Sequence, residues 1–141
     1  MILIRIVVGL VFLSEGILKF TQSAELGSGR FALIGIPYPG LLAPFVAVIE
    51  IVAGAAMMLG LYAGDAAVLL LIVISVALVT TKIPVLLGQA LGRFQLPKLN
   101  HYGLLSFLHE ARADLCMLFG CAAILIDGGL QLGKKKQWYK R

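Results

Sequence analysis

The chain has 141 residues, of which 60% are apolar and 13% are charged, and its mean hydropathy is +0.99. Soluble domains are about 45–50% apolar and about 25% charged, and small domains leave much of their surface in solvent. This composition excludes a soluble domain, a disordered tail and a disulfide-stapled secreted module. The net charge of +5 does not indicate a nucleic-acid partner, because basic residues also gather at membrane surfaces. We expect one membrane domain with room for about four spans of roughly 20 residues.

The first half of the chain predicts two membrane-spanning helices. Residues 2–20 are long and apolar enough to cross a bilayer, and they carry Arg5, Glu15 and Lys19. No A-x-A-like cleavage site follows and the charges lie in the wrong half for a signal peptide, so we interpret this segment as a retained span. Residues 41–62 follow the turn-rich sequence GIPYPG and are interrupted only by Glu50. This segment is the second predicted span.

The second half of the chain predicts two further spans. Residues 66–83 are apolar and β-branched as far as Thr81, and their length favours a helix over a strand. The short Gly and Asp connection before them predicts an antiparallel helical hairpin. Residues 104–127 form the fourth span, with polar residues in its first half. The expected fold is an all-α, four-helix antiparallel membrane bundle over residues 1–133.

The distribution of basic residues predicts the orientation in the membrane. An even number of spans places both termini on one side. The tail at 134–141 is basic and contains Trp138 and Tyr139, which suit the headgroup region. Because positively charged loops stay in the cytoplasm, we expect this tail and both termini to be cytoplasmic. Arg30, Arg93 and Lys98 would then lie outside.

Charged residues inside the predicted spans are the main functional signal, because one charge at the bilayer centre costs at least ~2.5–3.5 kcal/mol. Glu50 lies near the middle of the second span, and Asp114 reaches a similar depth from the same side. We expect Glu15 to pair with Lys19 one turn later. Glu110 and Asp114 share one helix face. The candidate polar pocket consists of Glu15, Lys19, Glu50, Lys82, Glu110 and Asp114.

With Arg112 included, the outer half of the predicted spans holds four acids and three bases. We therefore expect pairing inside the bundle, with one acid left over and protonated. Glu50 is the candidate, because its own helix offers no base within two turns. Two interpretations stay open: a pocket for a small polar molecule, a quinone headgroup or a proton, and ion pairs that only fix helix order. For Lys82 or Arg112 taken alone, we favour a side chain that extends to the membrane surface.

Other reactive residue types carry weaker signals. Cys116 and Cys121 are five residues apart, about 140° around a helix, so we expect apolar packing rather than a redox pair. His101 and His109 lie near one end of one predicted helix and cannot flank a haem by themselves. The sequence has no zinc-ligand spacing, P-loop or G-x-G-x-x-G motif. We expect no metal site and no catalytic set in this chain.

The order of several motifs is similar to that of a known family. Arg5 is followed by GLVFLSEGILKF, Phe31 precedes GIPYP, and Glu50 opens EIVAGAAMMLGLY. Together these residues resemble the DoxX family of small four-helix membrane proteins, as far as the third span. Lys82 matches the polar or basic residue at the end of that span, and Glu110 or Asp114 supplies an acid early in the fourth. The chain departs from the family in its longer loop at 84–103 and its more charged fourth helix.

The resemblance implies a role beside redox proteins in the cytoplasmic membrane of a prokaryote. Family members are described as membrane parts of a thiosulfate:quinone oxidoreductase, as partners of redox and thiol-stress proteins, or as assembly factors. We expect a non-catalytic accessory or assembly subunit that contacts the lipid bilayer and other membrane subunits or a second copy, with no nucleic acid. The alternatives are a subunit that binds a quinone, which is then the possible cofactor, and a carrier for a small solute or protons.

Overall fold

The computed structural model describes residues 1–87 and 103–128, in which all regular structure is helical. The predicted all-α class is confirmed for these residues. The basic tail, Arg93, Lys98 and His101 lie outside them. The elements are α1 (Ile2–Thr21), α2 (Ser28–Ile34), α3 (Pro39–Leu59), α4 (Ala63–Ala77), the π-helical turn η1 (Leu78–Lys82), α5 (Ile83–Leu87) and α6 (Leu104–Gly128).

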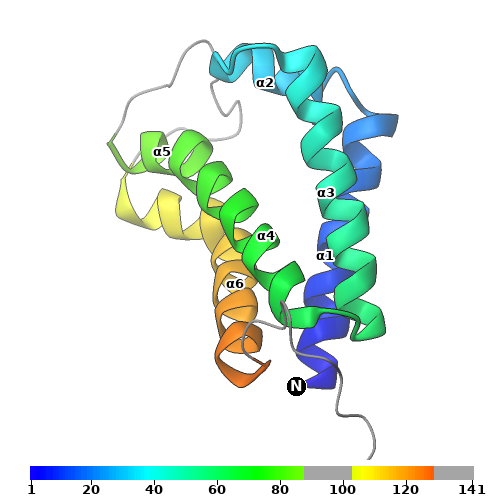
Figure 1. Ribbon diagram of the computed structural model, residues 1–141. Coiled ribbons are helices and arrows are strands. Elements are labelled where there is room, and N and C mark those ends of the chain that lie inside the picture. Colours follow the sequence, from blue (N-terminus) through cyan, green and yellow to red (C-terminus); the bar gives the residue numbers. More distant parts are fainter. Residues whose placement is uncertain (88–102, 129–141) are drawn as a thin grey trace, which may run out of the picture.

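The helices form two pairs rather than one closed bundle. α1 packs against α3, and α4 packs against α6. Figure 1 shows that the pairs meet at the end where α3 turns into α4 and diverge toward the end that holds α2 and α5. A closed four-helix antiparallel bundle is therefore not confirmed. The start of α1 and the end of α6 lie at the same end of the molecule (Figure 1).

One apolar core joins all four long helices where the pairs meet. It combines buried side chains of α1, α3, α4 and α6, so each helix contributes one stripe to a common interior. Its larger members are Val8, Phe12, Met57, Leu70, Ile74, Met117, Cys121 and Ile124. We call this half of the molecule the closed half, and the half with α2 and α5 the open half.

Glycines bring the backbones of α1 and α3 into contact. A Cβ atom on Gly54 would lie 2.8 Å from the carbonyl oxygen of Gly9 and 2.9 Å from the backbone nitrogen of Leu13. A Cβ on Gly16 would lie 2.7 Å from the carbonyl oxygen of Ala47. Small residues allow such an approach between membrane helices, where van der Waals contact replaces the hydrophobic effect. The α1–α3 pair is therefore closely packed along its length.

A tight turn joins α3 to α4. Gly60 ends α3 with a φ of 71°, and its amide donates to the carbonyl of Met57. Such a left-handed cap suits glycine, which has no Cβ to clash. Tyr62 then begins α4, which runs back beside α3. The predicted helical hairpin between the second and third segments is confirmed.

The connection between α1 and α3 contains a short helix that the sequence pattern does not predict. α2 covers Ser28–Ile34 and ends at Gly35, which has a φ of 89°. The amide of Ile36 donates to the carbonyl of Phe31 and closes this end. The GIPYPG sequence therefore follows the end of α2 and includes the start of α3.

Two helical segments satisfy the length and composition of a membrane span by themselves. They are α3 and the continuous segment Ala63–Leu87, which joins α4, η1 and α5. α3 rises about 31 Å over its 21 residues, close to the ~30 Å of a bilayer core. Exposed tyrosines lie at its two ends, Tyr38 and Tyr62, as is typical of residues at the membrane interface. Crossing by α1 and α6, which carry more charges, stays a prediction.

The glycine contact between α1 and α3 generates a stability prediction. We expect Gly54→Ala to destabilise the protein by about 1–3 kcal/mol, because the added methyl meets backbone atoms that cannot move independently. Gly40→Ala is the matched control in the same helix, since a Cβ there meets nothing within 4 Å. Thermal unfolding of both variants in detergent measures the difference. Equal stability of the two variants would contradict the close packing.

Candidate functional site

Ion pairs join charged side chains of different helices in two separate places. Lys19 of α1 bonds to Glu50 of α3, and we call this contact the inner ion pair. Lys82 lies beside Glu110 and Asp114 of α6, and we call these three residues the Lys82 cluster. The structure thus brings together five of the six residues of the predicted pocket, but in two places. The sixth, Glu15, is exposed on α1.

The inner ion pair is short and buried. Lys19 Nζ lies 2.6 Å from Glu50 Oε2, and the two side chains are only 13% and 5% exposed. A Cβ on Gly16 would lie 3.1 Å from the Cβ of Glu50, so a glycine keeps α1 close to α3 beside the acid. This proximity lets the Lys19 stem reach across the interface. The ion pair therefore adds a polar tie to the close packing of α1 against α3 around Gly16.

Two sequence predictions about these residues are wrong. Glu50 does have a base, and Lys19 bonds across helices to Glu50 instead of within its own helix to Glu15. Within one helix, i,i+4 spacing makes a partner visible in the sequence. The partner of Glu50 is 31 residues away. The glycine at position 16 was the signal that could have indicated a close helix neighbour.

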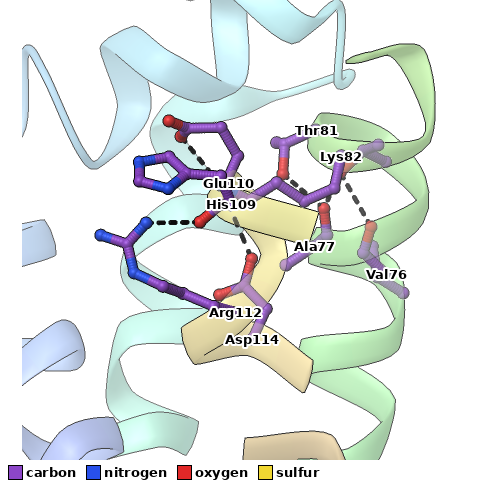
Figure 2. Close-up of polar contacts among 9 residues, drawn as sticks. Val76, Ala77, Thr81, Lys82, His109, Glu110, Arg112 and Asp114 are labelled. Atoms are coloured by element: carbon purple, nitrogen blue, oxygen red, sulfur yellow. Dashed lines mark hydrogen bonds and ion pairs between the residues drawn. The ribbon is translucent and has the colours of Figure 1, made fainter. Parts of the chain in front are cut away.

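The Lys82 cluster has a looser geometry. Lys82 Nζ lies 3.7 Å from Asp114 Oδ2 and 4.0 Å from Glu110 Oε2. Charge-assisted hydrogen bonds are about 2.7–2.9 Å long, so the lysine lies between two carboxylates without closing on either. Figure 2 shows the side chain of Lys82 reaching from its helix toward the two acids of α6. The carboxylate side chains are 24% and 26% exposed, which leaves them accessible to a further group.

A π-helical turn positions Lys82. Pro84 has no amide hydrogen and would clash with the carbonyl of Thr80 in a regular α-helix. The widened turn Leu78–Lys82 accommodates it, so the helix continues to Leu87 instead of ending near the proline. The Thr81 hydroxyl donates to the carbonyl of Ala77 at 2.6 Å. The extra residue in the turn also changes the direction of Lys82, and π-helical turns are frequent at functional sites.

Arg112 does not join either group. Its guanidinium donates to the backbone carbonyl of His109, one turn earlier in α6, and both residues are exposed (Figure 2). Arg112 therefore takes no part in the pairing expected among the acids and bases of the bundle, and its exposure agrees with the alternative of a side chain that reaches the surface. On α6, residues 110 and 114 face the α4 side, while residue 112 lies on another face. The predicted shared face of Glu110 and Asp114 is confirmed by their common neighbour, Lys82.

The Lys82 cluster combines groups that recognise polar ligands. Its ammonium group donates hydrogen bonds, and its two carboxylates accept them when ionised. Among the residues that the structure describes, no three histidine, cysteine or acidic side chains are arranged to hold a metal ion. Cys121 is buried in the core and Cys116 is exposed, so the two thiols do not meet. The Lys82 cluster can therefore both donate and accept hydrogen bonds.

Known proteins resemble this chain over most of its length. The model of the DoxX family matches residues 1–83. An uncharacterized membrane protein of Mycobacterium tuberculosis is 46% identical over 127 residues, which cover 90% of this chain and 74% of that protein. No solved structure matches significantly. The family match includes the α1–α3 pair and ends just beyond Lys82.

The inner ion pair generates a prediction about stability. We expect Glu50→Leu to destabilise the protein by about 3–5 kcal/mol, because it leaves the Lys19 ammonium buried without a partner. The double variant with Lys19→Met should recover much of this loss. Glu25→Gln is the control, because Glu25 is exposed in the connection after α1 and a surface substitution should change stability by less than about 0.5 kcal/mol. Thermal unfolding in detergent measures all three variants. A larger effect at Glu25 than at Glu50 would contradict the observed pairing.

Proposed function

Since the chain belongs to the DoxX family of membrane proteins, we propose that it acts as a non-catalytic accessory or assembly subunit of a larger membrane complex with a redox or respiratory role. In this role the protein supplies a rigid pair of helices against which other membrane subunits pack. The cytoplasmic membrane of a prokaryote, with both termini in the cytoplasm, is the proposed location.

The observation that carries this proposal is the inner ion pair. The Lys19 and Glu50 side chains are bonded at 2.6 Å and are only 13% and 5% exposed, which leaves a ligand little access to them. Their charges are used to hold α1 against α3. Removing either partner would strand a buried charge, so the pair resists separation of the two helices. A helix pair held in this way is suited to a supporting role.

The shape of the chain supports the same role. The α1–α3 unit is locked by backbone contacts at Gly9, Gly16 and Gly54 as well as by the ion pair. Its outer face presents large apolar side chains, among them Leu41, Phe45 and Val52 of α3. Such a face packs equally well against lipid or against apolar helices of other subunits. A rigid unit with an apolar exterior meets the requirements of an assembly subunit.

Purification in a mild detergent tests the proposal. We expect the wild-type chain to migrate in a stoichiometric assembly with other membrane proteins. Glu50→Leu, which loosens the α1–α3 unit, should release the chain from this assembly. Glu25→Gln, in the exposed connection after α1, is the control and should leave the assembly intact. A chain that always migrates alone, from gently extracted membranes, would contradict the accessory role.

A second candidate function is favoured by the open geometry of the Lys82 cluster. A quinone has carbonyl oxygens that accept hydrogen bonds from an ammonium group, and its reduced form has hydroxyl groups that donate to carboxylates. Lys82, Glu110 and Asp114 offer both kinds of partner, and the acids are about a quarter exposed. In this alternative the chain is a quinone-interacting subunit of an oxidoreductase, and a partner subunit delivers the electrons.

Bound quinone distinguishes this alternative. If the Lys82 cluster holds the headgroup, solvent extraction of purified protein yields quinone, and Lys82→Met lowers the yield about tenfold, equivalent to roughly 1.4 kcal/mol. Thr80→Val on the same π-helical turn is the control, because it keeps the shape of the turn and the position of Lys82. Equal yields from wild type and Lys82→Met would remove the cluster from quinone binding.

A further inference from the structure

α1 and α6 contact each other in the closed half of the molecule. A Cβ on Gly120 of α6 would lie 2.6 Å from Cγ2 of Val8 and 3.8 Å from Cγ2 of Ile4. The two helices run antiparallel, since the start of α1 lies beside the end of α6 (Figure 1). We call the facing surfaces of these helices the α1–α6 seam. The Gly120 contact closes the part of the seam that lies in the closed half of the molecule.

The helix register defines what lies further along the seam. Seven residues, or about two turns, return to nearly the same helix face. Seven residues beyond Val8 lies Glu15, and seven residues before Gly120 lies Ala113. Because the helices are antiparallel, these two positions are level with each other. Arg112 is the neighbour of Ala113, so an acid on α1 and a base on α6 have almost the same depth.

Both of these charged residues lack an acid–base partner among residues 1–87 and 103–128. Glu15 is exposed and forms no ion pair there, because Lys19 bonds to Glu50. Arg112 is exposed and donates only to a backbone carbonyl. Glu15 lies about 9 Å from the end of α1, and Arg112 about 12 Å from the start of α6, by helix rise. Charges at such depths are costly when they face lipid.

We propose that the open part of the α1–α6 seam binds a second copy of this chain. Glu15 of one copy pairs with Arg112 of the other, and the same contact is repeated about a twofold axis. A twofold contact requires one surface that is complementary to itself, and a surface with one exposed acid and one exposed base meets this condition. The two ion pairs remove four charges from lipid at once.

The membrane makes this arrangement more specific. Copies of one protein insert in the same orientation, so the twofold axis of a dimer is parallel to the membrane normal. Residues that pair across such an axis must have the same depth. The register of the seam places Glu15 level with Ala113, next to Arg112, so the requirement is met. The exposed methyl group of Ala113 also allows close approach, as small residues do between membrane helices.

This dimer goes beyond the proposed accessory role and does not depend on it, because the purified chain alone should form it. Cross-linking between two differently tagged copies provides the first test. One copy carries Glu15→Cys and the other Ala113→Cys, both with Cys116→Ser to remove the exposed native thiol. We expect an oxidised product that contains both tags. Ser14→Cys replaces Glu15→Cys in the control, because Ser14 is exposed at the same depth but points about 100° away.

Two results of this experiment would overturn the proposal. Equal cross-linking from positions 14 and 15 would mean random collision of copies. Absence of the product with both tags, together with a disulfide when Glu15→Cys and Ala113→Cys are placed on one chain instead, would mean that the seam closes within a single molecule. In that case Glu15 and Arg112 would be partners in the same copy.

Charge reversal provides the second test. Glu15→Arg alone and Arg112→Glu alone should each lower the dimer fraction about tenfold or more, because each places like charges at both contacts. The variant with both reversals restores opposite charges and should recover the dimer. The dimer fraction is measured by native mass spectrometry in a mild detergent. An unchanged fraction in both single variants would exclude the ion pairs as the cause of association.

Discussion

The bond between Lys19 and Glu50 is the contact on which the arrangement of α1 and α3 depends. An isolated charge in a membrane interior is expensive, so each partner requires the other. The short distance of 2.6 Å is possible only because Gly16 leaves room for the backbones to approach. The glycine packing and the ion pair are therefore one feature. Together they hold α1 closely against α3.

The second helix pair also brings charges of opposite sign together, but at longer distances. Lys82 serves two carboxylates at 3.7 and 4.0 Å, and the π-helical turn around Pro84 decides where its ammonium group lies. This cluster remains partly exposed in the open half, where the two pairs diverge, while apolar side chains fill the closed half. The molecule thus separates a packed end, which provides stability, from a polar end, where contact with a ligand or another protein is chemically useful.

The positions of the helices were largely predictable, because the length of an apolar run is a local property of the sequence. The predicted segment at 2–20 corresponds to α1, and the segment at 104–127 corresponds to α6. The turn at Gly60 was visible from its glycine and aspartate neighbours. α2 was missed because seven residues carry too little periodicity. The extension to Leu87 was missed because a proline normally ends a helix, and only the π-helical turn accommodates it.

The sequence by itself determined that the chain is all-α, that it belongs in a membrane and that its predicted spans contain acids and bases in nearly equal number. These properties depend on composition and on spacing within one helix. Only the tertiary structure decided which acid meets which base. Glu50 forms an ion pair with Lys19, Lys82 lies beside the acids of α6, and Arg112 is exposed and bonds to a backbone carbonyl. Pairing between helices depends on how their faces are rotated and how closely glycines let them approach, and neither quantity is written in the spacing of one segment.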